Sequence, residues 1–285
     1  MTDSQTPTCF LRIRAIYPQL SDKEKKVADL ILSDPEKIIH ATINEIAGEL
    51  GIADATVFRF CKRIGFKGYQ ALKIALATES KAPLKEIHAE INDGDDEKAI
   101  ITKVFKSNIR TLEDTSKIIN FNDFTKATNV LIGARKIDFY GNGGSGPIAL
   151  DAHHKFLRTG LLSSWYNDPH LQMMSAAQLT CEDVIVCISH SGTSKDAIEI
   201  LNIAKSNGVK TIGITHYGNT PLSQIADISL LTMSEETEFR TEALASRLAQ
   251  LSIIDALYVS VCLQMKDQVK QSINKLRNAM AVKRL

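Results

Sequence analysis

The sequence predicts an N-terminal all-α helix-turn-helix domain followed by an α/β domain of three layers, whose middle layer is a doubly wound parallel sheet. Three observations lead to this prediction. Short helical patterns, with no strand-like run, fill the chain before residue 80. After Lys136, short runs of β-branched and aromatic residues alternate with segments of helix length, as in parallel βαβ units. An acidic stretch with Pro83 and Gly94 lies between these regions, so we expect domains at 1–80 and 98–285 and a linker at 81–97.

The overall composition indicates a folded protein and excludes several classes. The 285 residues are 44% hydrophobic and 24% charged, which excludes collagen-like and disordered chains. A net charge of +1 means that any nucleic-acid surface must be local. The five cysteines form no C-x-x-C pair, which argues against a zinc site or a disulfide framework and fits a reducing cytoplasm. No apolar run reaches the roughly 18 to 20 residues of a membrane span. We therefore expect a cytoplasmic protein without membrane contact, metal or cofactor.

In the N-terminal domain, the sequence Thr42-Ile43-Asn44-Glu45 is typical of a capping box and predicts the start of a helix. Gly51 supplies a left-handed residue that ends this helix. After a short turn, Asp54 is expected to cap a second helix, which ends before Gly65. Two short helices joined by so tight a turn are typical of a helix-turn-helix motif. The second helix should bury the stripe Val57, Phe60, Cys61 and Ile64.

The opposite face of the second helix is predicted to be basic and to bind a double-stranded DNA operator. No acidic residue occurs between Ala55 and Thr78, so the positive charge is concentrated there. In helix-turn-helix docking, residues early in the recognition helix reach base edges, and basic residues further on contact phosphates. We expect Thr56 and Arg59 to read bases. The full DNA-binding set adds Ala55 and the phosphate contacts Lys62, Arg63 and Lys67. A helical domain with a solvated basic face remains the alternative.

A glycine-rich loop follows the first predicted strand of the C-terminal domain. Residues Lys136 to Tyr140 run into Gly141-Asn142-Gly143-Gly144-Ser145-Gly146, and a helical pattern follows. A strand, a glycine loop and a helix N-terminus form an anion site, because unpaired amides and the helix dipole both favour negative charge. The loop also matches G-x-G-x-x-G, and Asp168 follows about twenty residues later. A dinucleotide site is therefore one alternative.

A second loop, rich in serine, favours a phosphate ligand over a dinucleotide. The predicted strand Val184 to Ile188 leads into Ser189-His190-Ser191-Gly192-Thr193-Ser194. Serine hydroxyls surround a glycine at this second strand-to-helix turn, and hydroxyls with backbone amides can hold a phosphate without an obligatory Lys or Arg. A dinucleotide fold does not need this second loop. The simpler alternative is a turn whose serine only caps its own helix.

Together these motifs resemble a known family. The serine loop, the glycine loop through Ser145 and the sequence Ser246 to Leu251 resemble the sugar isomerase (SIS) domain. With the helix-turn-helix ahead of them, the chain resembles an RpiR-family transcription regulator from Ile16 to Met280. The resemblance implies a SIS domain that binds a phosphorylated sugar and dimerises. The usual Thr of the serine loop is Ser194 here, which puts the ligand preference, but not phosphate binding, in doubt. The resemblance implies that Ser145, Ser189, Ser191 and Ser194 hold the ligand. We add Gly192 of the same loop and Glu242 to the expected ligand-binding residues.

We expect a DNA-binding transcription regulator that senses a phosphorylated sugar, controls sugar-metabolism genes and is not an enzyme. Its expected partners are the DNA operator, the phosphorylated sugar effector and further copies of itself, in a homodimer or homotetramer. A SIS-type sugar-phosphate isomerase or etherase is the first alternative, which would need a general base such as Glu242 or His190. A dinucleotide-binding regulator is the second.

Overall fold

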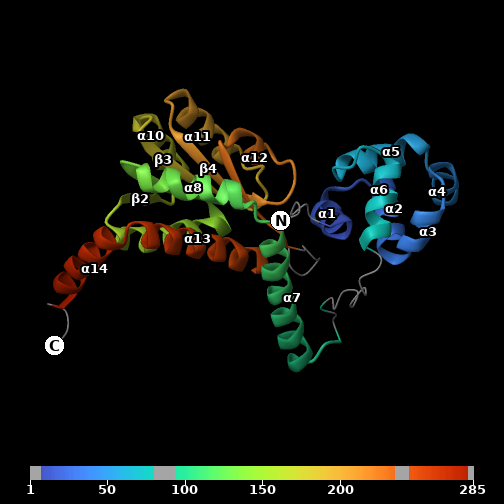
Figure 1. Cartoon of the computed structure of the whole chain (residues 1–285), viewed down its shortest axis with the longest axis horizontal. Coiled ribbons are helices and arrows are strands. Elements are labelled where there is room, and N and C mark those ends of the chain that lie inside the picture. Colours follow the sequence, from blue (N-terminus) through green and yellow to red (C-terminus); the bar gives the residue numbers. More distant parts are fainter. Residues whose placement is uncertain (1–7, 80–90, 92–93, 235–243, 282–285) are drawn as a thin grey trace. The chain divides into compact units, whose positions relative to one another are not determined.

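The computed structural model describes residues 8–79, 91, 94–234 and 244–281 of the chain. The chain divides into two compact units, and the boundary falls after Ser107, inside one long helix. Figure 1 shows the elements of both units. Most of the expected linker, residues 81–90 and 92–93, lies outside the described residues.

The first unit is helical in its described part, so the predicted all-α N-terminal domain is confirmed. Residues such as Ile31, Phe60 and Leu72 are fully buried and form its apolar interior. Its helices are α1 (Cys9–Ile16), α2 (Asp22–Ser33), α3 (Pro35–His40), α4 (Ile43–Leu50), α5 (Asp54–Arg63) and α6 (Tyr69–Glu79), with a 3-10 turn η1 (Tyr17–Gln19).

Helices α4 and α5 are the predicted helix-turn-helix pair. The Thr42 hydroxyl accepts a hydrogen bond from the Glu45 amide, and the Glu45 carboxylate accepts one from the Thr42 amide at 2.7 Å, which confirms the capping box. Gly51 has a φ of 62° and ends α4 as predicted. The prediction that Asp54 caps α5 is wrong, because Ala53 is the N-cap and makes no side-chain hydrogen bond. Asp54 is instead the first helical residue, where its negative charge suits the helix dipole.

The second unit has the predicted α/β architecture, and its described part has five strands, among them those expected at Lys136 to Tyr140 and Val184 to Ile188. They are β1 (Lys136–Gly141), β2 (Leu162–Tyr166), β3 (Asp183–Ile188), β4 (Lys210–His216) and β5 (Ile228–Thr232). The long helix α7 (Glu97–Ile118) crosses the boundary between the units. The other helices are α8 (Phe121–Gly133), α9 (Gly146–Phe156), α10 (Pro169–Gln178), α11 (Lys195–Ser206), α12 (Pro221–Ile225), α13 (Leu244–Gln264) and α14 (Lys266–Ala281), with 3-10 turns η2 (Gly143–Ser145) and η3 (Leu157–Thr159).

The sheet is parallel throughout and has helices on both faces. Its strands follow the order β2-β1-β3-β4-β5. Because side chains alternate along a strand, Phe139 packs into one apolar core and Tyr140 into another. The first core contains residues of α8, α9 and α13, and the second contains residues of α10, α11 and α12. The three layers are visible in Figure 1 and confirm the predicted doubly wound sheet.

Helix α13 corrects one expectation about apolar runs. Its residues Ala245–Gln264 are long and apolar enough to cross a membrane by length and composition, although no such run was expected. One face of this helix, which includes Ile253, Ile254 and Leu257, is buried in the core beside α8 and α9. This packing accounts for the apolar residues on that face of α13.

Candidate functional site

The two predicted loops meet at one edge of the sheet. β1 and β3 are neighbours, and Gly141 at the end of β1 pairs with Ile188 at the end of β3. The glycine loop therefore lies beside the serine loop. The strand order also reverses between β1 and β3, and ligands of open α/β sheets bind beyond the carboxyl ends of the strands at such a switch point.

A pocket with about 290 Å³ of empty space, including its open mouth, occupies this position. Three of its polar residues are buried: Gln172 is 1% exposed, Ser189 7% and Ser145 9%. None of the described side chains that line the pocket carries a formal charge. The lining residues are Tyr140, Gly141, Asn142, Ser145, Gln172, Cys187, Ile188, Ser189, Ser194 and Ala197.

The glycine loop is a tight turn that excludes larger residues. A Cβ at Gly141 would lie 2.5 Å from the carbonyl oxygen of Ser145, and Gly143 has a left-handed φ of 52°. The Ser145 amide donates to the carbonyl of Asn142 at 3.0 Å, and α9 begins directly afterwards. The turn thereby places Ser145 in the pocket wall at the N-terminus of α9.

Hydrogen bonds hold the serine loop against the end of β4. The Ser189 amide donates to the carbonyl of Ile214 at 3.0 Å. The carbonyl of His190 accepts from the His216 amide at 3.0 Å and from the Thr215 hydroxyl at 3.2 Å. These bonds hold the loop in one conformation, which reduces the entropy lost when a ligand is bound.

The structure brings three of the expected ligand residues together in the pocket: Ser145, Ser189 and Ser194. Ser191 and Gly192 belong to the same loop but do not line the pocket. The Ser191 hydroxyl instead accepts hydrogen bonds from the amide and the hydroxyl of Thr193, at 3.3 and 3.0 Å. Glu242 lies outside the described residues.

Ser194 lies in the pocket wall and is also the N-cap residue of α11. Its hydroxyl accepts a long hydrogen bond, 3.5 Å, from the Ala197 amide. The simpler reading of the serine loop, in which a serine caps its own helix, therefore describes Ser194 correctly. A hydroxyl also retains a proton to donate while it accepts, so capping does not prevent Ser194 from contacting a ligand.

Gln172 and Asn142 also line the pocket, although neither was predicted as a ligand residue. Gln172 Nε2 donates to Asn142 Oδ1 at 2.9 Å and to the carbonyl of Tyr166 at 2.7 Å. Gln172 thereby joins the end of β2 to the glycine loop. The available signal was its position one turn before Ala176 on the buried side of α10, where a polar residue needs an explanation.

Arg247, near the start of α13, places positive charge beside the glycine loop. The guanidinium of Arg247 lies beside Gly144, and its Nη2 atom is 3.4 Å from the position that a Cβ there would occupy. The N-termini of α9 and α11 adjoin the pocket as well, and helix N-termini favour negative charge. The surroundings of the neutral pocket therefore favour an anion.

Two groups of the pocket wall are unsuited to acid–base chemistry near neutral pH. Burial raises the pKa of the Cys187 thiol to about 12. Burial, followed by the negative charge of Asp138, raises the pKa of the Tyr140 hydroxyl above its ordinary value. Cys187 belongs to the core that also contains Tyr140 and Ile185.

Asp168, the acidic residue of the dinucleotide alternative, is the N-cap residue of α10. Its carboxylate accepts a hydrogen bond from the Leu171 amide at 3.0 Å and caps α10. The capping bond uses one oxygen of the carboxylate and leaves the other able to accept hydrogen bonds. It is the serine loop beside the glycine loop that favours a phosphate over a dinucleotide.

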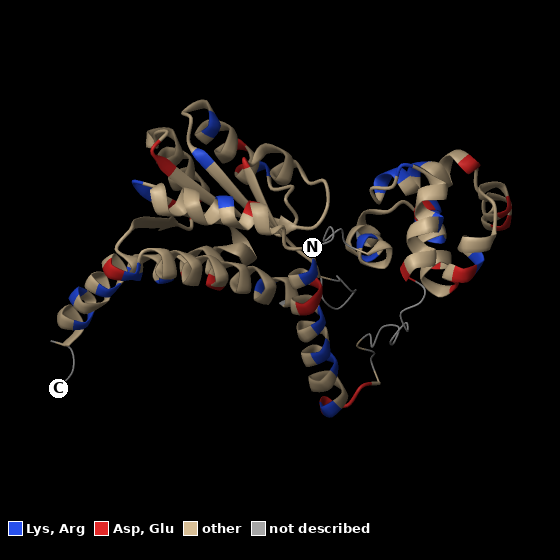
Figure 2. Ribbon diagram, viewed as in Figure 1, with Lys and Arg blue, Asp and Glu red and all other residues tan. Residues whose placement is uncertain are grey.

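The candidate DNA-binding surface of the first unit is the exposed side of α5. Ala55, Arg59 and Lys62 are exposed there, Lys67 is exposed in the loop that follows α5, and Figure 2 shows Lys and Arg residues gathered over α5. Phe58, which was not predicted to belong to this surface, is 44% exposed, and its ring centre lies 5.6 Å from the Lys62 ammonium. An aromatic residue on a basic face offers a contact for apolar groups of DNA as well as for Lys62.

Thr56 and Arg63 are placed differently from the other members of the expected DNA-binding set. Thr56 is only 7% exposed, because it lies one turn before buried Phe60 on the same side of α5. Its hydroxyl is 3.4 Å from Nη2 of Arg59 and can orient that side chain. Arg63 donates to Glu24 of α2 at 2.9 Å and to a carbonyl of η1 at 2.6 Å. The expectation that Thr56 lies on the exposed face is therefore wrong.

Comparison with known proteins agrees with both units. Residues 9–83 match the helix-turn-helix domain of the rpiR family, and residues 130–260 match the SIS domain. An uncharacterised HTH-type transcriptional regulator of Caldanaerobacter subterraneus is 36% identical over 273 residues, which cover 96% of this chain and 97% of that protein. This chain belongs to the RpiR family of transcriptional regulators.

Solved structures extend the similarity of this RpiR-family protein. The Vibrio vulnificus NanR protein complexed with ManNAc-6P matches with a TM-score of 0.61 and 25% identity, over 97% of this chain and 99% of NanR. The sugar isomerase domain of an RpiR transcription factor from Sphaerobacter thermophilus matches with a TM-score of 0.59 and 17% identity, over 63% of this chain and 98% of that domain. The second match shows the fold alone. The family and fold class that the motifs predicted are confirmed.

Proposed function

We propose that this RpiR-family protein binds a DNA operator through α5, senses a phosphorylated sugar in its SIS domain and thereby controls genes of sugar metabolism. The observation that carries the proposal is the pocket between β1 and β3, where the glycine and serine loops meet. We also propose that the domains are 1–80 and 98–285, joined by a linker at 81–97. The protein then acts in the cytoplasm as a homodimer or homotetramer.

The chemistry of the pocket suits both parts of a phosphosugar. Serine hydroxyls and two helix N-termini can donate hydrogen bonds to phosphate oxygens, and the Arg247 guanidinium can balance their charge. The amides of Asn142 and Gln172 suit the hydroxyls of a sugar, because an amide both donates and accepts. Phosphorylated and unphosphorylated forms of one sugar should therefore differ strongly in affinity.

The exposed side of α5 supports the DNA-binding part of the proposal. Arg59 is placed to reach base edges, with Thr56 orienting its guanidinium. Lys62 and Lys67 are exposed and suit phosphates of the DNA backbone. Arg63 shares its charge with Glu24, so its contribution to phosphate binding should be smaller.

The effector must act by differential binding. A ligand shifts an equilibrium only if it binds one conformational state more tightly than the other, so the phosphosugar must favour either the DNA-binding state or the inactive one. Linkage then requires that operator DNA changes the affinity for the phosphosugar by the same factor.

A thermal-shift screen against phosphorylated sugars tests the effector, with ManNAc-6P, the ligand of the NanR complex, as the first probe. Each compound is measured beside the same sugar without its phosphate. At least one phosphosugar should raise the melting temperature, whereas its unphosphorylated form should not. Selection from random duplexes then identifies the operator. Failure of every phosphosugar to stabilise the protein, with DNA binding intact, would refute the effector assignment.

A SIS-type isomerase or etherase is the second candidate function. His190 favours it, because this residue lies in the serine loop with its ring 5.3 Å from the ring of His216, and histidine is a common general base. Incubating the protein with each phosphosugar that binds, and following the sugar by NMR, separates the two functions. We expect no conversion, and conversion that a His190→Asn variant abolishes would establish the enzyme instead.

A further inference from the structure

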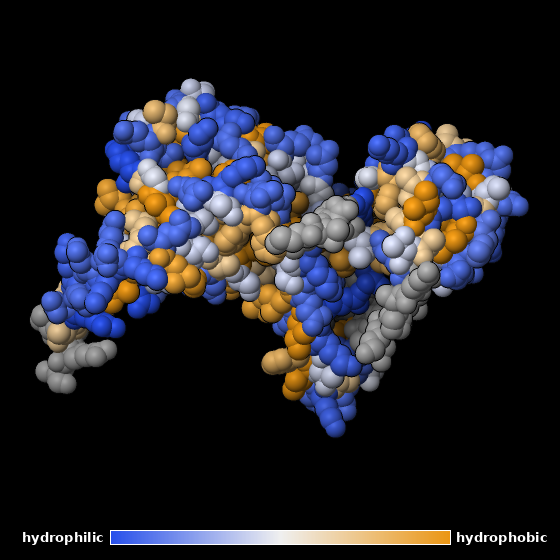
Figure 3. All heavy atoms as spheres, in the orientation of Figure 1, coloured by the Kyte–Doolittle hydropathy of each residue, from blue (hydrophilic) through white to orange (hydrophobic). Residues whose placement is uncertain are grey.

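The exposed side of α5 carries apolar groups between its basic residues. Phe58 is 44% exposed, and Ala55, which lies one turn earlier, is exposed as well. Arg59 and Lys62 are exposed beside them, and Figure 3 shows hydrophobic residues among hydrophilic ones on the first unit. At about 100° per residue, these four positions fall within about 100° of one another around the helix. The side of α5 that we propose to face DNA therefore combines apolar and basic groups.

The ring of Phe58 is held in place by its neighbours in the first unit. Its Cε2 atom lies 3.1 Å from the position that a Cβ on Gly68 would occupy, so one edge of the ring packs against the loop that follows α5. The ammonium of Lys62 lies 5.6 Å from the ring centre and is attracted to it. A ring whose position is fixed before binding loses little entropy when a ligand contacts it.

We propose that the ring of Phe58, together with the methyl group of Ala55, contacts the 5-methyl group of a thymine in the operator. A phenyl ring offers no ordinary hydrogen-bond donor or acceptor, so it cannot distinguish the polar groups of the base edges. The 5-methyl group of thymine is the apolar group that base pairs present in the major groove, and Ala and Phe side chains contact it there. Phe58 therefore gives α5 a preference for thymine that phosphate contacts cannot supply.

The thymine should lie close to the base that Arg59 reads. Arginine most often binds the O6 and N7 atoms of guanine. Consecutive Cα atoms are about 3.8 Å apart, which is similar to the rise of about 3.4 Å between base pairs. Because Phe58 and Arg59 are consecutive and are both exposed on this side of α5, their bases should be near neighbours. Each half-site should therefore contain a thymine within about two base pairs of a guanine.

The charges around Phe58 favour DNA over another protein as its partner. Arg59, Lys62 and Lys67 are exposed, and no acidic residue occurs between Ala55 and Thr78. The cores of protein–protein interfaces are depleted of charged residues, whereas the phosphates of DNA attract Lys and Arg. The inference rests on the proposed function, because it requires that α5 binds DNA with this side accessible to the bases.

Deoxyuridine in place of thymine tests the inference, because it removes the 5-methyl group alone. In the operator selected from random duplexes, each thymine is replaced in turn, and the affinity of the full chain is measured. At one thymine of each half-site, the replacement should lower the affinity of the wild type by about four-fold, the effect of burying one methyl group. In Phe58→Ala the same replacement should lower the affinity by about two-fold or less, because the contact with Ala55 alone remains. Phe58→Gln, a second variant that keeps a long side chain beside Gly68, should lose most of the discrimination too.

The matched control is Phe121→Ala, which removes a phenylalanine that is 61% exposed at the start of α8. This variant should distinguish thymine from deoxyuridine as the wild type does. Melting temperatures, and affinities for a scrambled duplex, show whether the Phe58 variants are folded and keep their phosphate contacts.

The outcomes separate this inference from the proposed function. An operator without a thymine near the guanine, or a wild type that is indifferent to deoxyuridine at every position, overturns the inference but leaves DNA binding intact. Equal discrimination by the wild type and a folded Phe58 variant overturns it as well. Absence of binding to any duplex refutes the DNA-binding function itself, and the inference with it.

Discussion

At the scale of single residues, Gly192 determines the shape of the serine loop although it does not line the pocket. Its φ of 63° is one that residues with a side chain rarely adopt. A Cβ would also lie 2.4 Å from the Thr220 hydroxyl and 2.6 Å from the Thr215 hydroxyl. Its amide donates to Ser189 at 3.2 Å and its carbonyl accepts from Leu222 at 3.0 Å. The loop therefore depends on glycine for its backbone conformation and for space.

Replacing Gly192 by alanine should lower the free energy of unfolding by at least about 2 kcal/mol, because backbone strain and overpacking each cost roughly 1 to 3 kcal/mol. Affinity for the phosphosugar should fall as well. Gly208→Ala is the control, since Gly208 has a similar φ of 73° but a Cβ there would make only an ordinary contact, 3.4 Å from the Cys181 Cβ. Urea unfolding measures both variants. Equal losses in the two would show that crowding at Gly192 is unimportant.

Replacing Ser145 by alanine should weaken phosphosugar binding without unfolding the protein. The hydroxyl is lost while the amides of the loop and the N-terminus of α9 remain. A hydrogen bond to a charged group contributes about 1.5 to 3 kcal/mol, so the affinity should fall by roughly ten-fold to a hundred-fold. Ser206→Ala, at the far end of α11, should bind like the wild type, because its hydroxyl donates to the carbonyl of Ile203. Calorimetry that gives the same affinity for both variants would place the phosphate elsewhere.

At the scale of elements, one side of α5 is buried in the core of the first unit and the other side is exposed. Val57, Phe60 and Cys61 are fully buried, whereas Arg59 and Lys62 are exposed. A helix with one buried stripe is held in place by its core, so substitutions on the other side can change DNA binding without unfolding the unit.

Alanine at Arg59 and at Lys67 should affect DNA binding in different ways. If Arg59 reads a base edge, its loss should cost about 1 to 3 kcal/mol on the selected operator and relax the preference at one base pair. Loss of Lys67 should weaken all duplexes alike and lower the slope of log affinity against log salt by about one unit. Titrations on operator and scrambled duplexes at several salt concentrations measure both effects. The same response from both variants would contradict the assigned roles.

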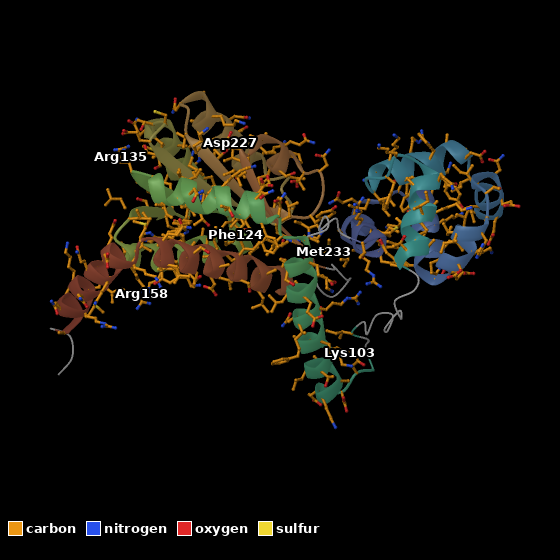
Figure 4. All side chains as sticks on the ribbon, viewed as in Figure 1. Lys103, Phe124, Arg135, Arg158, Asp227 and Met233 are labelled. Atoms are coloured by element: carbon orange, nitrogen blue, oxygen red, sulfur yellow. The ribbon has the colours of Figure 1, made fainter. Side chains whose placement is uncertain are left out.

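At the scale of the whole molecule, Asp183 links the fold of the second unit to pH. Its fully buried side chain accepts hydrogen bonds from Arg135 at 2.6 Å and from the amide of Thr180 at 2.8 Å, and Figure 4 labels Arg135. Burial alone would raise the pKa of Asp183, but the hydrogen bonds, above all from Arg135, outweigh it and lower the pKa. The ionised carboxylate therefore stabilises the folded state.

The contribution of Asp183 should be lost in acid. A carboxyl whose pKa is lower in the folded state stabilises fully above its unfolded value, about 3.9, and loses this effect as the pH falls through the folded value. Asp183→Asn should lower the free energy of unfolding at pH 7 by roughly 1 to 3 kcal/mol. The difference from the wild type should shrink below about pH 4. A difference that stays constant from about pH 7 to 3 would contradict this.

The control for Asp183 is Asp123→Asn. Asp123 lies on α8 and pairs with exposed Lys126 at 2.9 Å. Surface ion pairs contribute about 0 to 1 kcal/mol, so this variant should stay close to the wild type at pH 7.

Features that depend on a few neighbouring residues could be predicted from the amino-acid sequence alone. The capping box at Thr42, the end of α4 at Gly51 and the alternation of side chains along β1 and β3 follow from hydrogen bonds and side-chain directions within one or two turns. The glycine loop and the serine loop could be predicted from the sequence for the same reason, because each consists of neighbouring residues. The order of residues alone was therefore enough to predict the helix-turn-helix unit, the strands and the two loops that meet at the pocket.

Contacts between segments that are distant in the chain became known only from the three-dimensional fold. The strand order makes β1 and β3 neighbours and so joins the two loops in one pocket. The packing of helices adds Gln172 to the pocket and brings Arg247 to Gly144, and within the first unit it buries Thr56 on α5. These outcomes depend on contacts between segments far apart in the chain, whose free energies come from packing a whole core. No local pattern of residues encodes them, because the same helix or strand signal is compatible with many arrangements.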